Sequence, residues 1–432
     1  MKKIGLISLG CAKNLVDSEL ILGVFKKANY IISDQIEDSD AIIINTCGFI
    51  NEAKKESIKT IFEVLQKKKK NSLLIVVGCL AKRYKQELLK EIPEIDLIIG
   101  VDEYHNLPTI LENKFKNKFS SLSYENRVLT SFPLPFAYLK IGEGCSNRCA
   151  YCAIPLIRGD YYSYPKEVIL KEAKRLIDIG IKELVIIAQD TTRYGKDIYK
   201  DYYLENLLED ILKLDSNCWV RLLYLYPDRI SDNLIQLFSK YPNLLPYFDI
   251  PIQHSSQKML NAMHRSGNKS IYLDVINKIK NKIPNAVFRT TLIVGFPGED
   301  ENDFNDLKEF VQEIKFDHLG VFTYSDEENT PSHKFKNKIS KKIANQRKKE
   351  IMEIQQNISY LNNTKRINQI HDVIIEDFDG NNYYGRSYLY APDTIDGFVI
   401  IKSKQPLTIG TIIKVKIIKA YAYDIEGEVL NR

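Results

Sequence analysis

The stretch EGCSNRCAYCAIP, residues 143–155, carries three cysteines in the pattern C-x3-C-x2-C. A structural zinc normally takes four protein ligands, and no fourth cysteine or nearby histidine completes this set. Cysteine thiolates also hold 4Fe–4S cubes, and three of them leave one of the four irons without a protein ligand. An open iron can bind and reduce a small molecule. We therefore expect Cys145, Cys149 and Cys152 to form a reactive cluster site.

The composition is that of an ordinary globular protein rather than a disordered or membrane-spanning chain. The 432 residues are 44% hydrophobic and 27% charged, and this length corresponds to about three domains. The net charge of +5 is too mild to indicate nucleic-acid binding by itself. No apolar run approaches the roughly 18 residues that a bilayer span needs, so we expect no membrane association.

The N-terminal segment MKKIGLISLGC has two lysines before an apolar run, as a secretory signal does. The run at residues 4–10 is too short for such a signal, so a buried strand is the favoured interpretation and a signal or lipoprotein sequence is the alternative. We therefore expect a cytoplasmic protein. In that reducing compartment the seven cysteines are expected to be metal ligands or catalytic groups rather than disulfides.

Three short apolar runs, each ending at a cysteine, organise the first third of the chain. Helical patterns follow the runs, and continuous apolar strands alternating with amphipathic helices indicate a parallel α/β sheet. Parallel strands bring their carboxyl ends to one edge, so the three cysteines are expected to share one site there. The alternative is three separate core cysteines, since free cysteine is often buried. The runs are residues 4–10, 41–46 and 73–78, and the cysteines are Cys11, Cys47 and Cys79.

A second α/β series follows a polar connector at residues 116–135. Six candidate strands alternate with helical stretches, and six units rather than eight predict an incomplete barrel whose functional groups lie where strands end. The candidate strands are residues 136–141, 182–188, 219–225, 247–252, 286–294 and 318–324.

The remaining chain changes character twice. Residues 333–366 are strongly basic and helical, which a solvated helix joining two domains explains more simply than an RNA contact does. From about residue 364, short alternating strands with turns predict a small all-β barrel.

The cysteine loop, with Tyr151 before its last cysteine and a six-unit barrel after it, resembles the radical S-adenosylmethionine (SAM) superfamily. The resemblance implies that the open iron chelates SAM and that a radical removes hydrogen from an unactivated carbon. The segment GFPGE at residues 295–299 also resembles the superfamily, although a tight strand-to-helix turn would explain it alone. Gly295, Gly298 and Gln189 are the candidate residues of the SAM pocket.

The whole chain resembles the radical SAM methylthiotransferases, a family of transferases that replace C–H by C–S–CH3. That family's plan implies an N-terminal doubly wound parallel sheet (1–116), an incomplete (β/α)6 barrel (131–361) and a C-terminal all-β TRAM barrel (364–432). Cys11, Cys47 and Cys79 match its N-terminal cluster ligands. The resemblance thus implies two 4Fe–4S clusters, SAM, a reductant and a sulfur donor.

Two branches of the family differ in substrate. One modifies an adenosine of transfer RNA, and the other the β-carbon of an aspartyl residue in small-subunit ribosomal protein S12. SLGCAKNLVDSE (8–19) and GRSYLYAPDTIDG (385–397) resemble the ribosomal-protein branch. Residues 364–432 hold nine Lys and Arg and nine Asp and Glu, and this neutral balance favours a protein substrate over RNA phosphates. S12, or the ribosomal particle carrying it, is the expected partner of a monomeric enzyme.

Other residues carry weaker expectations. Cys218 beside Trp219 is expected in the core, and His254 is either functional or a satisfied polar group at the barrel rim. Gln189 and Asp190 end the second barrel strand as pocket candidates. The basic helix is a candidate contact for ribosomal RNA. An iron–sulfur electron-transfer or RNA-binding protein without radical chemistry is the alternative from another class.

Overall fold

The computed structural model describes residues 2–130, 135–393, 396–403 and 405–430. The chain folds into two compact units. The first contains residues 1–130, 142–164 and 325–333, and the second contains 131–141, 165–324 and 334–432. The expected domain boundaries stay predictions, and three of their end residues (1, 131 and 432) lie outside the described residues.

The first unit is built on a five-stranded parallel sheet in the order β2-β1-β3-β4-β5. The three apolar runs form its central strands, as expected from their β-branched content. The two outer strands are short and were not expected. The strands are β1 (Lys3–Ser8), β2 (Ile31–Ile32), β3 (Ala41–Thr46), β4 (Leu73–Gly78) and β5 (Leu97–Gly100).

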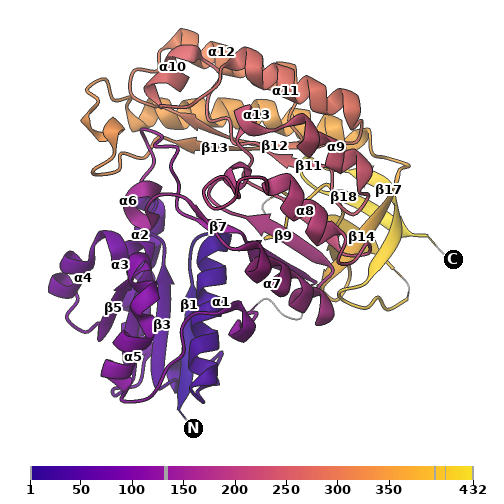
Figure 1. Ribbon diagram of the computed structural model, residues 1–432. Coiled ribbons are helices and arrows are strands. Elements are labelled where there is room, and N and C mark those ends of the chain that lie inside the picture. Colours follow the sequence, from indigo (N-terminus) through magenta and orange to yellow (C-terminus); the bar gives the residue numbers. More distant parts are fainter. Residues whose placement is uncertain (1, 131–134, 394–395, 404, 431–432) are drawn as a thin grey trace. The chain divides into compact units, whose positions relative to one another are not determined.

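Helices cover both faces of this sheet, so the doubly wound prediction is confirmed (Figure 1). Successive side chains of a strand point to opposite faces. Ile43 accordingly packs under one set of helices, while Ile42 and Ile44 pack under the other. The first set is α1 (Ala12–Lys27) and α5 (Leu107–Phe115), and the second is α2 (Asn51–Lys67), α3 (Cys79–Arg83) and α4 (Lys85–Glu91).

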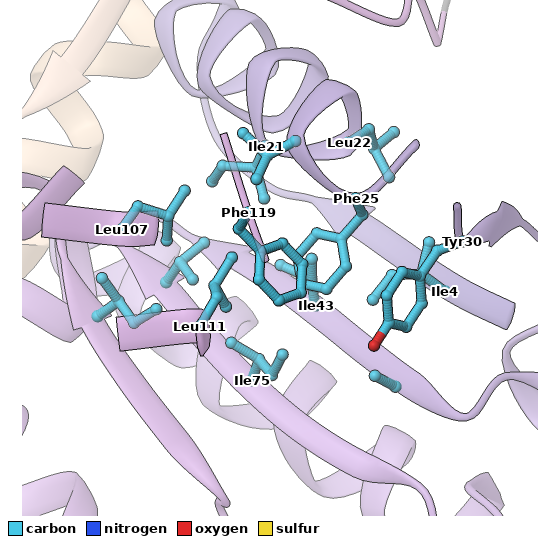
Figure 2. Packing of buried hydrophobic residues seen from close by; sticks show 14 residues of the cluster. Ile4, Ile21, Leu22, Phe25, Tyr30, Ile43, Ile75, Leu107, Leu111 and Phe119 are labelled. Carbon is cyan, nitrogen blue, oxygen red and sulfur yellow. The ribbon is translucent and has the colours of Figure 1, made fainter. Parts of the chain in front are cut away.

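An aromatic cluster closes the core under α1 and α5 (Figure 2). The ring centroids of Phe25 and Phe119 are 5.3 Å apart, and Phe25 also meets Tyr30 edge to face at 5.3 Å. Phe119 belongs to the expected polar connector, which a buried ion pair between Arg127 and Glu19 (2.6 Å) also fastens. The connector is therefore packed onto the first unit up to residue 130, and residues 131–134 lie outside the described chain.

Two later segments complete the first unit. In the segment 142–164, β7 (Gly142–Glu143) pairs antiparallel with β8 (Tyr162–Ser163), and the short helix α6 (Ile154–Arg158) lies between them in sequence. In the segment 325–333, Glu327 forms ion pairs with Lys54 (2.9 Å) and Arg83 (2.7 Å).

The second unit contains the six expected barrel strands, arranged as two parallel three-stranded sheets. The orders are β10-β9-β6 and β11-β12-β13, and a parallel bridge between Val220 and Leu244 connects them. The expected incomplete barrel is thus present. Its strands are β6 (Phe136–Lys140), β9 (Glu183–Ile187), β10 (Trp219–Leu222), β11 (Tyr247–Asp249), β12 (Val287–Val294) and β13 (His318–Thr323).

Helices alternate with these strands, as the sequence pattern predicts. Their apolar faces are buried, as Leu207 and Ile211 of α8 show. The helices are α7 (Lys166–Asp178), α8 (Leu204–Leu212), α9 (Asp232–Lys240), α10 (Gln257–Ala262), α11 (Lys269–Lys282) and α12 (Glu301–Ile314).

The basic segment forms one long helix, α13 (Lys341–Thr364). Its residues Ala344, Ile351 and Ile358 are buried, so it packs onto the second unit and is not the solvated linker that the charge pattern suggested. Apolar residues at helical spacing outweigh the lysines on its other face. No helix in the described residues is both long and apolar enough to cross a bilayer.

The C-terminal module is a closed five-stranded barrel, as expected. The end of its second strand and the loop after it together contact all six strands of the incomplete barrel. The module's strands are β14 (Ile370–Phe378), β15 (Tyr383–Arg386), β16 (Val399–Lys402), β17 (Ile412–Ala420) and β18 (Ile425–Val429). The strand residues that meet residues 386–396 are Tyr138, Glu183, Arg221, Tyr247, Arg289 and His318.

Candidate metal centres

The carboxyl edge of the N-terminal sheet brings Cys11, Cys47 and Cys79 to one place. The strand order reverses between β1 and β3, and ligands of such sheets bind beyond the strand ends at this switch point. Cys11 precedes the first residue of α1, Cys47 directly follows β3, and Cys79 begins α3 directly after β4. The thiols of Cys11 and Cys47 lie close enough to act electrostatically on the thiol of Cys79.

Close packing of the cysteine loops requires glycine beside the cysteines. Gly10 has φ +89°, and a Cβ there would lie 2.7 Å from the Cβ and 3.0 Å from the Sγ of Cys47. A Cβ on Gly48 would lie 2.8 Å from the backbone nitrogen of Leu80, next to Cys79. Real Cβ atoms do not approach other atoms this closely. Glycine before Cys11 and after Cys47 therefore allows the cysteine loops to pack against each other.

Two buried asparagines fix the geometry of this edge. Asn14 donates from Nδ2 to the carbonyls of Leu9 and Thr46, both at 3.1 Å, and so joins the ends of β1 and β3. Asn45 donates in turn to the carbonyl of Asn14 at 2.8 Å. The Ser57 hydroxyl accepts from the backbone nitrogen of Cys47 and donates to its carbonyl, both at 3.0 Å. We did not anticipate these residues from the sequence, because isolated polar residues give no periodic signal.

The electrostatics of the first triad favour a bound cation. Burial is the main cause that raises the pKa of Cys79 to about 12, with the Cys11 and Cys47 thiols acting in the same direction. Arg158 opposes this shift. Burial also raises the pKa of Cys47. Metal binding requires thiolates, and three neighbouring thiolates, two of them buried and Cys11 exposed, need positive charge to offset their repulsion and the burial of Cys47 and Cys79. An iron–sulfur cluster would supply that charge.

The second triad lies on a loop held by backbone hydrogen bonds. Cys145 and Cys149 are buried and Cys152 is partly exposed. The backbone nitrogen of Cys145 donates to the carbonyl of Gly159, and that of Cys152 donates to the carbonyl of Cys149, both at 3.0 Å. Ser332 also donates to the carbonyl of Ala150 at 3.0 Å. Both triads therefore belong to the first unit.

Neither triad is arranged for a single metal ion. Within the described part of the chain, no group of three or more His, Cys, Asp or Glu side chains could hold one ion. A mononuclear site requires donors that converge on one point. A 4Fe–4S cube instead takes one thiolate at each of three irons, so its ligands can stand further apart. By donor type, three thiolates without a fourth protein ligand match a 4Fe–4S cube with one open iron and do not match a four-ligand structural zinc site.

The remaining pocket candidates lie at the carboxyl ends of strands in the second unit. Gln189 follows β9, and Gly295 directly follows β12. The carboxylate of Glu299 accepts hydrogen bonds from the backbone nitrogens of Gly295 (2.6 Å) and Phe296 (3.2 Å), which holds the GFPGE turn. Gly298 donates its backbone N–H to the carbonyl of Asn337 at 2.8 Å. The turn is thus a rigid feature at a strand end, where ligands bind in such folds.

Asp190, His254 and Cys218 are all buried. Asp190 forms ion pairs with Arg229 and, at 3.4 Å, with Arg193. The Nδ1 of His254 accepts from the backbone nitrogen of Ser256 at 3.0 Å, while its Nε2 has no hydrogen-bond partner among the described residues. Cys218 lies in the core, as expected.

Three family models match successive parts of the chain. Residues 3–100 match the uncharacterized protein family UPF0004, residues 139–311 match the radical SAM superfamily, and residues 367–430 match the TRAM domain. The order of these matches is the order expected for a methylthiotransferase.

Relatives along the whole length decide the family. A protein of Alkaliphilus oremlandii named "Ribosomal protein uS12 methylthiotransferase RimO" is 48% identical, with 98% of both chains covered. Proteins of the same name are 47% identical in Clostridioides difficile (100% of this chain, 99% of the relative) and 46% identical in Thermoanaerobacter sp. (99% and 100%). The chain belongs to the RimO family.

Solved structures agree with the fold of a RimO family member. The radical SAM methyltransferase TsrM from Kitasatospora setae, solved with cobalamin and a [4Fe-4S] cluster, gives a TM-score of 0.56 at 11% identity. The match covers 77% of each chain. The cobalamin-dependent SAM radical enzyme OxsB gives 0.52 at 12% identity, covering 82% of this chain and 56% of that one. At these identities the likeness shows the radical SAM architecture alone.

Proposed function

We propose that this protein is a radical SAM methylthiotransferase that inserts sulfur and a methyl group at the β-carbon of an aspartyl residue in ribosomal protein uS12. The observation that carries the proposal is the identity of 43–48% along the full length to proteins with that name. The alternative from the same family is modification of a transfer-RNA adenosine.

Two 4Fe–4S clusters and SAM are the cofactors of the proposed reaction. Cys11, Cys47 and Cys79 would hold one cluster, and Cys145, Cys149 and Cys152 would hold the other, which binds SAM. When bound, the clusters and SAM supply the electron, the hydrogen-abstracting radical, the sulfur and the methyl group. The chemistry of three thiolates in each set, with glycine-permitted close approach in the first, supports this assignment.

The protein's own contribution is to position these groups. Asn14 and Asn45 fix the loops that carry the first triad, and the buried carboxylate of Glu299 fixes the turn after β12. Gln189, Gly295 and Gly298 are proposed to contact SAM because they follow strands of the radical SAM barrel, whose functional groups gather at strand ends.

The charge of the TRAM module supports a protein substrate. Of its nine basic residues, Lys404 and Arg432 lie outside the described part of the chain. Arg386 is buried and paired with Glu183 and Glu376, so it cannot face an RNA phosphate. Five exposed lysines remain in the described module, at 365, 402, 414, 416 and 419. Lys402 and Lys414 pair with Glu426 and Asp372, which offsets part of the positive charge that an RNA-binding surface needs.

The ribosome is the proposed setting of the reaction. We place the enzyme in the cytoplasm as a monomer that needs a reductant and a sulfur donor. The proposed contact with ribosomal RNA falls to Lys341, Lys342 and Lys348 on α13. Arg347 on the same helix is buried and paired with Glu299 at 2.7 Å, so it is not proposed as an RNA contact.

An anaerobic assay tests the substrate. Reconstituted and reduced enzyme, SAM and sulfide are mixed with a uS12 target-loop peptide in one tube and transfer RNA in another, and products are read by mass spectrometry. A methylthio mass gain on an aspartate of the peptide is expected. A gain on the RNA instead would move the protein to the other branch and overturn the charge argument.

A further inference from the structure

Arg158 is a buried cation that connects the two cysteine triads of the first unit. It ends helix α6, just after the loop that carries Cys145, Cys149 and Cys152, and its side chain is 1% exposed. Its Nη2 nevertheless lies 3.5 Å from the Sγ of Cys79, in the other triad. This distance is within the range of an N–H donor to sulfur.

The guanidinium is held by residues that lie near each of the two triads. Asp17, on the helix that follows Cys11, accepts from Nη2 at 3.0 Å. Glu143, which precedes Cys145, accepts from Nη1 at 2.7 Å. Asn14, which joins the ends of β1 and β3, also accepts from Nη2 at 2.6 Å. Planar guanidinium groups suit such multiple recognition, whereas a lysine would offer only a point charge.

A purely structural ion pair would explain Asp17 and Glu143 but not the approach to sulfur. If Arg158 served only to offset the partial negative charge at the C-terminus of α6, its Nη2 would not need to lie beside the Sγ of Cys79, a candidate cluster ligand. Cluster reduction potentials are set in part by net charge and by hydrogen bonds to the sulfurs. Reduction adds negative charge, so a cation at the ligand favours the reduced form and raises the potential.

We propose that Arg158 is a positioning residue that ties the two cysteine sites together and raises the reduction potential of the cluster held by Cys11, Cys47 and Cys79. This proposal rests on the proposed function, because it assumes that Cys79 is a cluster ligand. Through Arg158, the loop of the SAM-binding site directly sets the electronic environment of the other site.

The test is an EPR-monitored redox titration of the full chain with Cys145, Cys149 and Cys152 replaced by alanine, so that only the N-terminal cluster contributes. In this background Arg158→Gln is expected to disfavour reduction about tenfold, a shift of about 59 mV to lower potential for a one-electron couple. Arg158→Lys keeps the charge and is expected to shift the potential less.

Arg148→Gln is the matched control. Arg148 lies on the loop that carries the second triad and pairs with Asp160, but its side chain is 63% exposed. The same loss of charge there is expected to leave the potential unchanged. Equal potentials in the parent, Arg158→Gln and Arg148→Gln, or equal shifts in both variants, would overturn the proposal.

Asp17→Asn keeps the proposal testable if Arg158→Gln fails to fold or load iron. It removes a negative charge beside the guanidinium, so it is expected to raise the potential, and a lowered or unchanged potential would contradict the proposal. The iron and sulfide content of the parent distinguishes a failure of the cluster-ligand assignment from a failure of the role proposed for Arg158. A parent that holds no N-terminal cluster refutes the ligand assignment, whereas a loaded cluster with invariant potential refutes only the role of Arg158.

Discussion

At the scale of single residues, the six candidate ligands differ from the seventh cysteine in what surrounds them. The candidate ligands stand at strand ends or on a loop. Cys218 lies 3% exposed in the core, and burial raises the pKa of its thiol to about 12. Cys79 is buried to the same degree but lies beside the thiols of Cys11 and Cys47, whereas the Cys218 thiol donates to the carbonyls of Ile181 (3.8 Å) and Trp219 (3.7 Å). Cys218 therefore serves as an internal control for experiments on the other six.

Replacing one cysteine of the second triad should separate the two sites. Cys149→Ala is expected to abolish reductive cleavage of SAM and to leave the N-terminal cluster in place, because the two triads use different thiolates. Cys218→Ala should retain both the cleavage of SAM and the N-terminal cluster. Formation of 5′-deoxyadenosine by the reduced enzyme is the measurement, and cleavage that survives in Cys149→Ala would refute the assignment of the SAM-binding triad.

His254 gives a prediction about pH. Burial is the main cause that lowers its pKa from 6.5 to about 4, so the folded protein keeps the ring neutral. Between these values the unfolded chain binds the proton more readily, and stability falls as the pH drops from about 6.5 toward 4. Burial also lowers the pKa of His371 to about 4, so His371 contributes a similar loss of stability over the same pH range.

His254→Gln should therefore lose less stability on acidification than the parent. The difference at pH 5.5 is expected to be roughly 1–2 kcal/mol. Urea unfolding followed by the fluorescence of Trp219, the single tryptophan, measures it in the second unit. His264→Asn, at an exposed position of the same unit, should keep the parent's pH dependence. Equal slopes in all three proteins would contradict the prediction.

At the scale of elements, the end of β15 and the loop after it contact several strands of the incomplete barrel. Arg386 pairs with Glu183 of β9 at 2.7 Å, and Arg221 of β10 donates to the carbonyl of Tyr388 at 3.0 Å. The hydroxyl of Tyr247 on β11 donates to Asp396 at 2.5 Å. The barrel has six β/α units instead of eight, and residues of the TRAM module supply contacts to its strands.

Removing Arg386 should destabilise the second unit as a whole. The buried carboxylate of Glu183 would keep only Arg221 as its partner, and breaking a buried pair costs roughly 3–5 kcal/mol. Arg386→Met is expected to lower the urea midpoint reported by Trp219. Lys414→Met, which breaks an exposed pair with Asp372, should change it little. An unchanged midpoint in Arg386→Met would show that the loop is not needed for barrel stability.

Much of the element plan is readable from the sequence, and the reason is physical. Continuous β-branched runs such as residues 41–46 and 73–78 have few alternatives to a buried parallel strand. The same pattern does not reveal β2, which is two residues long, or the buried face of α13 beneath its lysines. Short pairings and mixed helix faces depend on tertiary partners, which local pattern does not record.

At the scale of the whole molecule, the site was readable only where its residues are chemically distinctive. The six candidate cysteine ligands could be recognised from their residue type and their spacing in the sequence. Arg158 does not, because its partner Asp17 is 141 positions away in sequence and arginine is usually a surface residue. Long-range ion pairs of this kind require the fold before they can be recognised.

The basic helix gives a prediction about ribosome binding. Lys341→Gln, Lys342→Gln and Lys348→Gln together should weaken binding to ribosomal particles and make it less sensitive to salt, because phosphate contacts release counterions. Replacement of three exposed lysines at the end of α2 and just after it in the first unit, Lys67, Lys69 and Lys70, is the charge-matched comparison. Binding measured by co-sedimentation that is the same in both variants and the parent would argue against an RNA contact through α13.

The central claim is that one chain holds two separate clusters on two sets of three cysteines. Iron and sulfide analysis with Mössbauer spectroscopy tests it on the parent and on two variants, each with one triad replaced by alanine. The account predicts that each variant keeps about half of the parent's iron as a 4Fe–4S cluster. Retention of all the iron after loss of either triad would contradict it, because that triad would then hold no cluster.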